Sequence, residues 1–399
     1  MAQTWRVTPA KRFVLGILGG VGAAAAPLLK FLWPPRRQND ESVRRILVIE
    51  LWLLGDVVLM TPMLRALRER YPGAEISVLA KPHAEELLRE SGLADKIITF
   101  DFPWTAKTAK YKPGRYDRRL MRDLIRRLRR ENFDLAIDGR MDARSSALAY
   151  ATGAPTRIGY DFGGGGFLLT HALRASPDDH HRAHDWLKLL EPLDDGRWND
   201  GARTTAVELG RRYAPRLTVS LAERADAERR LRSFGIQDGE LIVGIHPGAS
   251  RPQGRWPLEH FAWVAESVTS RYGARCIIFL DPEGHGESMP LRSEAYFVRA
   301  SLREMMALMT CCDVFICNDS GPMHIADALG VPVVGIFTTG NPVWHRPFGE
   351  QQLFVGRGTG HDFVSYPTRD EVLAAAEKQL ERARTSRTEN APAMEPAEQ

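Results

Sequence analysis

The sequence predicts an α/β protein made of two similar domains, each a parallel sheet covered by helices on both faces. Short apolar runs of strand length alternate with segments of helical periodicity in both halves of the chain. The 399 residues suffice for two domains of ordinary size, and a hydrophobic content of 44% supplies a core for each. We therefore expect an N-terminal segment at 1–43, domains at 44–216 and 217–384, and a loose tail at 385–399.

The chain begins with an apolar segment at 13–33 that has basic residues on both sides. A membrane-spanning helix needs about 20 apolar residues, and here Pro27 and Lys30 interrupt the run. We expect an uncleaved helix that lies on or in the inner face of a membrane, with its basic flanks toward anionic headgroups. Two alternatives stay open: a signal peptide, although no cleavage site stands out, and a poorly ordered extension.

The N-terminal domain is expected to begin with a buried strand at 46–49 and a loop that ends in Gly55-Asp56. Residues 57–70 carry apolar side chains at helical spacing, and Thr61-Pro62 marks either a helix start or a first-turn kink. Further strands are predicted at 76–79, 96–100 and 135–137.

Residues 107–130 are dense in lysine and arginine, and their second part places Leu120, Leu124 and Leu128 at helical spacing. One interpretation is an amphipathic helix with a solvated basic face, and the other is contact with phosphates or anionic lipid. Nucleic acid is not expected as a partner, because no aromatic-rich or helix-turn-helix pattern accompanies the charge.

Two loops in this domain have the composition of ligand-binding loops. Asp138-Gly139-Arg140 follows a predicted strand, and a glycine run at 163–166 follows Arg157-Ile158-Gly159-Tyr160. Ligands of open α/β sheets bind at the carboxyl ends of strands, so both loops are candidates.

A histidine-rich stretch, His180-His181 with His184-Asp185, has the composition of a metal site. The apolar pattern that follows predicts a helix start instead, so we expect no metal ion there. The four cysteines include no Cys-x-x-Cys pair, and we interpret them as buried thiols in a reducing cytoplasm. The net charge of +4 permits an acidic partner without requiring one.

The C-terminal domain repeats the alternation after a polar passage at 194–216. Helices are predicted at 222–234, 258–270 and 302–310, the second with Pro257 at its first position, and strands at 241–245 and 276–280.

The densest group of polar residues follows a predicted buried strand at 314–317. Ser320 is expected to cap the next helix, whose first turn contains Pro322, and Gly330 closes that helix before a strand at 333–337. A helix start after a strand directs free N–H groups and partial positive charge at a bound anion. This turn therefore predicts a site for a phosphorylated ligand.

Three segments together resemble glycosyltransferase family nine, the lipopolysaccharide heptosyltransferases. That family has the GT-B fold, in which two Rossmann-like domains with parallel sheets face each other across a cleft. The resemblance covers about residues 44–383, and the three motifs occur in the expected order, one per loop. The segments are Ile46-Leu47-Val48-Ile49 through Leu54-Gly55-Asp56-Val57-Val58-Leu59-Met60-Thr61-Pro62, then Gly244-Ile245-His246-Pro247-Gly248-Ala249-Ser250 with Arg255-Trp256-Pro257, and Asn318-Asp319-Ser320-Gly321-Pro322-Met323-His324, with weaker agreement at Asp138 and at Arg157-Ile158-Gly159-Tyr160.

The resemblance implies transfer of a heptose or related sugar from an ADP-sugar to the lipopolysaccharide inner core, with inversion at the anomeric carbon. It implies no metal ion and no cofactor other than the nucleotide-sugar co-substrate, and the sequence contains no Asp-x-Asp pair. The implied partners are that donor, a glycolipid precursor of lipopolysaccharide as acceptor, and a membrane surface. The implied location is the cytoplasmic face of the bacterial inner membrane.

By the same resemblance, Asp56 is the general base that takes the proton of the acceptor hydroxyl. The alternative is that Asp56 only caps a helix. Gly55, Asp138, Arg140 and Arg157 are implied to bind the acceptor.

On the donor side, the resemblance implies that Asp319 hydrogen-bonds the donor sugar and that Glu283 meets the ribose or base. The chain departs from the family at Gly254, where a lysine is common, so Arg251 or Arg255 is expected to supply that charge. The implied donor-binding residues are His246, Gly248, Ala249, Ser250, Arg251, Arg255, Glu283, Asp319, Ser320, Gly321, Met323 and His324.

Three other functions compete with transfer. A nucleotide-sugar epimerase of the same fold would release a free sugar and need no lipid acceptor. An NAD oxidoreductase is less favoured, because no strand is followed by Gly-x-Gly-x-x-Gly. The departure at Gly254 also keeps a non-catalytic carbohydrate-binding relative in consideration.

Overall fold

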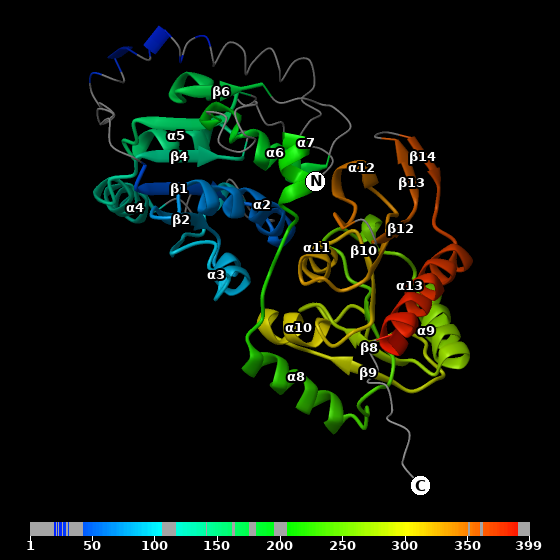
Figure 1. The fold of residues 1–399 in the computed structure, drawn as a ribbon. Helices are drawn as coiled ribbons and strands as arrows, with labels where there is room; N and C mark the ends of the chain where they lie inside the picture. The colour runs from blue at the N-terminus through cyan, green and yellow to red at the C-terminus, as the bar shows by residue number, and fades with distance from the viewer. Residues whose placement is uncertain are drawn as a thin grey trace. The chain divides into compact units, whose positions relative to one another are not determined.

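The computed structural model describes residues 43–105, 117–140, 142–161, 164–174, 181–194, 206–349, 352–359 and 362–389, with isolated positions between 20 and 31. The chain divides into two compact units, Met1–Thr218 and Val219–Gln399, which we call the N-terminal and C-terminal units (Figure 1).

The N-terminal unit contains a six-stranded parallel sheet with the strand order β3-β2-β1-β4-β5-β6. The strands predicted at 46–49, 76–79, 96–100 and 135–137 are all present as members of this sheet. The strands are β1 (Arg45–Glu50), β2 (Glu75–Ala80), β3 (Lys96–Thr99), β4 (Leu135–Asp138), β5 (Thr156–Tyr160) and β6 (His171–Leu173).

Helices cover this sheet, and one of its faces packs on the apolar sides of two of them. Leu124 of α4 and Leu148 of α5 join Leu47 and Ile49 of β1 in one buried cluster. Because both faces of the central strands are covered, β1 is a nearly continuous apolar run. The helices are α2 (Leu54–Arg70), α3 (His83–Leu88), α4 (Arg118–Arg130), α5 (Ala143–Ala151), α6 (Arg182–Lys188) and α7 (Ala206–Arg212), with short 3-10 turns at η1 (Pro103–Thr105), η3 (Gly166–Leu168) and η4 (Glu191–Leu193).

Pro62 lies well inside α2, so the predicted helix start or first-turn kink at Thr61-Pro62 is wrong. A proline lacks the N–H that would bond the carbonyl four residues earlier, which here belongs to Val58. The hydroxyl of Thr61 donates to that carbonyl at 2.7 Å and replaces the missing donor. The helix therefore starts at Leu54, which places Asp56 in its first turn.

The C-terminal unit contains a second six-stranded parallel sheet, with the order β12-β11-β10-β7-β8-β9. A two-stranded antiparallel ribbon follows it. The strands are β7 (Ile242–His246), β8 (Arg275–Phe279), β9 (Ala295–Val298), β10 (Val314–Asn318), β11 (Val333–Ile336) and β12 (Leu353–Val355), and the ribbon is β13 (Arg357–Thr359) with β14 (Asp362–Ser365).

One face of this second sheet packs on α9 and α13 through Phe261, Val264, Val372 and Leu380. The predicted helices and the strand–helix–strand unit from residue 314 are confirmed, although Pro257 is the N-cap of α9 and not its first residue. The helices are α8 (Leu221–Ser233), α9 (Leu258–Tyr272), α10 (Leu302–Met309), α11 (Gly321–Ala328), α12 (Pro342–His345) and α13 (Arg369–Glu389), with a 3-10 turn at η5 (Pro252–Gly254).

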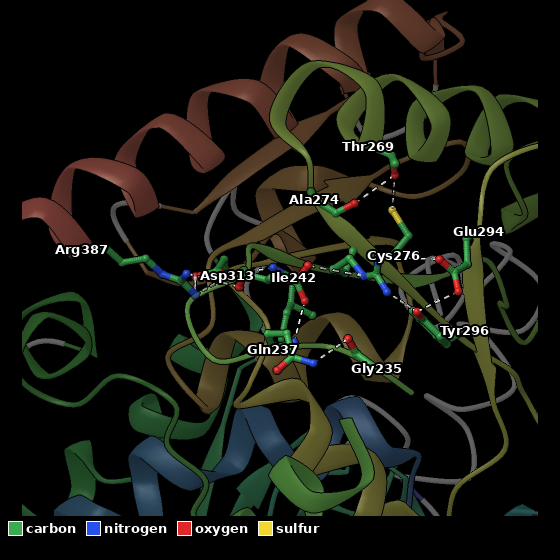
Figure 2. Close-up of polar contacts among 12 residues, drawn as sticks. Gly235, Gln237, Ile242, Thr269, Ala274, Cys276, Glu294, Tyr296, Asp313 and Arg387 are labelled. Carbon is green, nitrogen blue, oxygen red and sulfur yellow. Dashed lines mark hydrogen bonds and ion pairs between the residues drawn. The ribbon is translucent and has the colours of Figure 1, made fainter. Parts of the chain in front are cut away.

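A network of polar contacts connects residues at the amino ends of the strands of this sheet (Figure 2). The carboxylate of Asp313 accepts the N–H of Ile242 at 2.8 Å and pairs with Arg387 at 2.7 Å. Arg387 lies near the end of α13, so the loose tail predicted from residue 385 is wrong for residues 385–389. The network ties the last turns of α13 to the starts of β7 and β10, on the edge opposite the strand ends that carry polar loops.

Several predictions fall on segments that the structure describes only in part. The apolar segment 13–33, the basic residues 107–116, Gly163 and His180 lie largely or wholly outside the described residues. Within the described part of the chain, no helix is long and apolar enough to cross a membrane. The four cysteines carry free thiols, and the predicted burial is confirmed for Cys276, Cys312 and Cys317, whereas Cys311 is partly exposed.

Candidate active site

In each sheet the strand order reverses between two central neighbours, β1 and β4 in one and β7 and β10 in the other. Loops diverge from the carboxyl ends of strands at such a reversal and leave space for a ligand. Polar side chains occupy both places. We call them the β1–β4 site and the β7–β10 site.

Asp56 belongs to the β1–β4 site and is half-buried in the first turn of α2. Its Oδ2 accepts the N–H of Leu53 at 3.1 Å, so Asp56 does cap the helix with one oxygen. Burial raises its pKa to about 6, and the hydrogen bond from Leu53 and the charge of Arg140 oppose that rise. The group is therefore ionised at neutral pH but close enough to neutrality to accept a proton.

Asp138 ends β4 and is fully buried. Its Oδ1 accepts the backbone N–H of Arg140 at 3.0 Å, and its Oδ2 accepts the hydroxyls of Ser145 and Ser146 at 2.9 and 3.0 Å. Burial raises the pKa of Asp138 to about 6 against these hydrogen bonds. Because protein donors engage both oxygens, Asp138 shapes the loop that carries Arg140.

The guanidinium of Arg140 stacks on the ring of Trp52, with 4.7 Å from its Cζ to the ring centroid. Its Nε is buried and has no hydrogen-bond partner among the described residues. Burial lowers the pKa of Arg140, and the carboxylates of Glu50, Asp142 and Asp56 oppose that change. The site thus holds a cation with an unused donor beside Asp56.

Glu50 is a part of this site that sequence reasoning missed. It ends β1, is 3% exposed, and its Oε1 accepts the N–H of Trp52 at 2.5 Å. Burial and the neighbouring Asp56 raise the pKa of Glu50 to about 8. The available signal was an acid directly after an apolar strand and directly before the Gly55-Asp56 loop.

Glycine is required at position 139. A Cβ on Gly139 would lie 2.1 Å from the Trp186 ring, so α6 packs directly on the backbone between Asp138 and Arg140. Gly55 lies in the first turn of α2, next to Asp56.

Arg157 is not brought to this site, contrary to its predicted role in acceptor binding. It lies near the amino end of β5, and its guanidinium donates to the carbonyls of Leu168 at 2.8 Å and Ala154 at 2.5 Å. The side chain is 3% exposed and stacks near Tyr150. Arg157 therefore connects β5 with Ala154 and Leu168, near the amino ends of the strands and not at their carboxyl ends.

Four loops after successive strands each contain a buried side-chain nitrogen with no hydrogen-bond partner in the described part of the chain. The nitrogens are Nε1 of Trp52 after β1, Nε2 of His83 after β2, Nε1 of Trp104 after β3 and Nε of Arg140 after β4. The Trp104 ring lies 5.5 Å from Cζ of Arg144 in α5, so the loop after β3 reaches the loop after β4. The two indole nitrogens and Nε of Arg140 are donors, so their position at one edge fits an oxygen-rich ligand.

In the β7–β10 site, Asn318 holds the loops together. Its Nδ2 donates to the carbonyl of Pro247 at 2.7 Å, and its Oδ1 accepts the N–H of Trp256 at 3.0 Å. Asn318 is fully buried, so both contacts are protected from water. The amide therefore fixes the connection between β7 and α9, which carries predicted donor-binding residues, to the end of β10.

His246 ends β7, is buried, and has an Nδ1 with no partner among the described residues. Burial lowers its pKa to about 4, so its imidazole is neutral. A Cβ on Gly248 would lie 2.8 Å from both His246 Cε1 and Asp281 Oδ2, which makes glycine necessary there. The backbone can therefore pass closely between these two side chains.

Asp319 follows β10, and burial raises its pKa to about 7 while the charge of Arg251 opposes the rise. The predicted cap by Ser320 is wrong in its contact, since the hydroxyl donates to the carbonyl of Asn318 at 3.1 Å and does not bond the helix start. Gly321 is the first residue of α11, so its N–H has no partner within the helix. Pro322 has no N–H, and the N–H of Met323 donates to the carbonyl of Ser320 at 3.1 Å.

Two predicted donor-binding residues of α11 are buried side chains. Met323 is 0% exposed, and a Cβ on Gly335 would lie 2.7 Å from its sulfur, so the Met323 side chain packs in the core. His324 is 6% exposed, burial lowers its pKa to about 4, and its Nδ1 has no partner in the described part of the chain.

The loop from Ala249 to Arg255 holds the remaining candidates. Arg255 donates from Nε to the carbonyl of Ala249 at 3.0 Å, whereas Ser250 and Arg251 are exposed. A Cβ on Gly254 would make ordinary contacts with Ala249 Cβ and Thr339 Oγ1, both at 3.6 Å, so the backbone there has room for a side chain. Glu283 is exposed on the loop after β8.

Among the described residues, no group of three or more histidine, cysteine or acidic side chains could hold a metal ion. His181 is instead the N-cap of α6, and its Nδ1 accepts the N–H of Ala183 at 3.2 Å. The predicted helix start in this stretch is confirmed.

A family model described as Glycosyltransferase family 9 (heptosyltransferase) matches residues 121–367. Lipopolysaccharide heptosyltransferase 2 of Escherichia coli (strain K12) is 24% identical over 332 residues, which cover 80% of this chain and 90% of that protein.

Two solved structures share the fold. A glycosyl transferase family 9 protein from Veillonella parvula DSM 2008 has a TM-score of 0.71 at 24% identity, covering 87% of this chain and all of that one. The E. coli ADP-heptose lps heptosyltransferase II has a TM-score of 0.68 at 23% identity, covering 85% of this chain and 99% of that one. These likenesses and the two parallel sheets confirm the predicted GT-B fold class.

Proposed function

This chain belongs to glycosyltransferase family 9, and on that premise we propose that it transfers a heptose or related sugar from an ADP-sugar to the lipopolysaccharide inner core. The observation that carries the proposal is Asp56 at the strand-order reversal, ionised and with one oxygen not used in capping, next to the cation of Arg140. The names of its relatives supply the sugar and the acceptor.

The proposed reaction is a single displacement with Asp56 as general base. The acceptor hydroxyl passes its proton to Asp56 while its oxygen forms a bond to the anomeric carbon of the donor. The bond from that carbon to the diphosphate breaks, and its electron pair leaves with ADP, so the configuration inverts. A positioned base of this kind contributes about 10² to 10⁴ in rate.

Groups of the β7–β10 site are suited to the charge that develops on the departing diphosphate. The start of α11 offers the N–H of Gly321, and the loop after β7 offers the backbone of Gly248 with the cations of Arg251 and Arg255. We propose that these protein donors and cations do the work that a metal ion does in other transferases. Asp319 would bond the donor sugar.

On the acceptor side, the four unpaired nitrogens after β1 to β4 and the cation of Arg140 suit a sugar that carries phosphate or carboxylate groups. An acceptor of the lipopolysaccharide core is such a molecule. We propose that it binds at this edge, close to Asp56.

We also propose that the protein works at the cytoplasmic face of the inner membrane. The described part of the basic segment is α4, where Arg118, Arg119, Arg122 and Arg126 are exposed, and the apolar segment 13–33 has basic flanks. Deletion of residues 1–40 should move the protein from the membrane to the soluble fraction. Unchanged membrane recovery of the truncated protein would contradict the anchor.

Substitution of Asp56 tests the reaction itself. Asp56→Asn should lose at least a hundredfold in transfer because the amide cannot take a proton, while donor affinity should persist. Transfer is measured on a lipopolysaccharide-core acceptor, and donor affinity by thermal stabilisation with a panel of nucleotide sugars. Asp123→Asn, on the exposed side of α4, is the control.

Three results would contradict the proposal: full transfer by Asp56→Asn, stabilisation by no nucleotide sugar, or release of a free sugar without an acceptor. The last result would identify an epimerase.

A further inference from the structure

Glu50 is a buried carboxyl group at the centre of the β1–β4 site that the proposed reaction does not use. Ile49, the residue before it, pairs in register with Asp138 of β4, so Glu50 sits at the strand-order reversal. At 3% exposure it has almost no contact with water. A buried carboxyl group is costly in its charged form, so its presence here requires a reason.

One turn of the chain connects Glu50 with the proposed base. The N–H of Trp52 donates to Glu50 at 2.5 Å, and the next N–H, that of Leu53, donates to Asp56 at 3.1 Å. The guanidinium of Arg140 also stacks on the ring of this Trp52, with 4.7 Å between its Cζ and the ring centroid. Displacement of Glu50 would therefore move both the base and the cation.

The charged groups around Glu50 come from three elements. Asp56 faces it from α2, and Asp138 and Arg140 face it from the end of β4 and the loop beyond. Arg182 of α6 adds a second cation that acts on Asp56. Arg140 feels the charge of Glu50 more than that of Asp142, Asp56 or Asp138.

We propose that Glu50 is a positioning residue of the transfer reaction, which holds the Trp52 turn and keeps Arg140 free for the acceptor as long as Glu50 is uncharged. The proposal rests on the function proposed above, because it assigns Arg140 to the acceptor and Asp56 to the proton.

Burial and Asp56 raise the pKa of Glu50 to about 8, so Glu50 is neutral at pH 7 while Asp56 is ionised. Above pH 8 Glu50 becomes an anion and attracts the guanidinium of Arg140, which then competes with an anionic acceptor. Above pH 8 we therefore expect weaker acceptor binding. We expect no change in the proton transfer to Asp56.

The test compares Glu50→Gln with the wild type and with Glu75→Gln. Gln keeps the oxygen that accepts the N–H of Trp52 but cannot ionise, and Glu75 lies at the opposite end of the same sheet, at the start of β2. In the wild type and in Glu75→Gln, the acceptor KM should rise about tenfold from pH 7 to pH 9, as for one ionisation near pH 8. In Glu50→Gln the acceptor KM should stay level, and kcat should keep its dependence on pH.

A direct titration keeps the proposal testable if Glu50→Gln does not fold. Wild-type protein with ¹³C-labelled glutamate carboxyl groups should show one resonance that titrates near pH 8. The expected source of that resonance is Glu50, whose pKa burial raises to about 8.

The outcomes separate this inference from the proposed function. An acceptor KM that rises equally in Glu50→Gln, or the lack of a glutamate that titrates above pH 7, overturns the role of Glu50. Neither result contradicts the proposed function. Full transfer by Asp56→Asn would contradict it.

Discussion

At the scale of single residues, burial raises the pKa values of carboxyl groups in the candidate sites and lowers those of imidazoles. The carboxyl groups of Asp56, Asp138 and Asp319 have raised pKa values, and the imidazoles of His246 and His324 have lowered ones. One cause explains both, because an apolar surrounding disfavours whichever form is charged. The sites therefore contain neutral imidazoles and carboxylates that titrate close to neutrality.

The pH dependence of transfer should follow Asp56. Its pKa of about 6 predicts that kcat/KM falls as the pH drops below 6, because the protonated base cannot accept another proton. A pH profile from 5 to 7.5 measures this limb. Constant kcat/KM down to pH 5 would exclude a base with this pKa.

Acid should destabilise the protein through His324. Its folded pKa, about 4, lies below the unfolded value, so its contribution to stability is complete above pH 6.5 and is lost as the pH falls toward 4. From pH 7 to pH 5 this loss is about 2 kcal/mol of unfolding free energy. Between pH 7 and pH 5, the unfolding free energy of His324→Gln should therefore fall by about 2 kcal/mol less than that of the wild type. Urea unfolding at the two pH values measures both.

His171→Gln is the matched control for this prediction, because His171 is exposed on β6. Equal acid sensitivity of His324→Gln and the wild type would contradict the buried, neutral imidazole.

At the scale of elements, close packing of α6 on the loop after β4 sets the position of Arg140. The Trp186 ring occupies the space that a Cβ of Gly139 would need. In the C-terminal unit, Asn318 connects the end of β10 with both ends of the connection between β7 and α9. In both sites a single buried contact between elements positions the side chains that face the ligand.

Gly139→Ala should therefore destabilise the fold by about 1–3 kcal/mol and weaken acceptor binding, because its methyl group collides with Trp186. Chemical unfolding and the acceptor KM measure the two effects. Trp186→Leu, combined with Gly139→Ala, should restore part of the stability. Gly73→Ala is the control, since nothing lies within 4 Å of the added Cβ.

Wild-type stability and an unchanged acceptor KM in Gly139→Ala would contradict close packing of α6 on this loop.

At the scale of the whole molecule, each unit has its own sheet and core. In the C-terminal unit, Arg303 of α10 pairs with Glu223 of α8, and Arg387 closes the other end of the sheet. The hydrogen bonds of Asn318, Ser320 and Arg255 in the β7–β10 site join residues of this unit.

A fragment of residues 219–399 should therefore unfold cooperatively and be stabilised by the nucleotide diphosphate, whereas a fragment of residues 1–218 should not respond. Thermal unfolding with and without ADP measures both. A folded 219–399 fragment that ADP does not stabilise would contradict donor binding by the β7–β10 site alone.

Patterns along the chain predicted most of the fold. The apolar runs at 46–49 and 314–317 are strands β1 and β10, and the periodicity at 258–270 is helix α9. Strand and helix formation depend on neighbouring residues, so a linear pattern carries this information. The loops that follow those strands were also found, because polar residues and glycine after an apolar run are a local signal.

The sequence by itself determined the two α/β units, their strand-end loops and the family of the chain. Tertiary structure alone decided that Thr61 sustains α2 through Pro62, that Arg157 and Met323 serve packing, and that Glu50 lies beside Asp56 and Arg140. Those roles depend on burial and on contacts between residues far apart in the chain. A side chain's charge and partners follow from the space around it, and only the packed molecule defines that space.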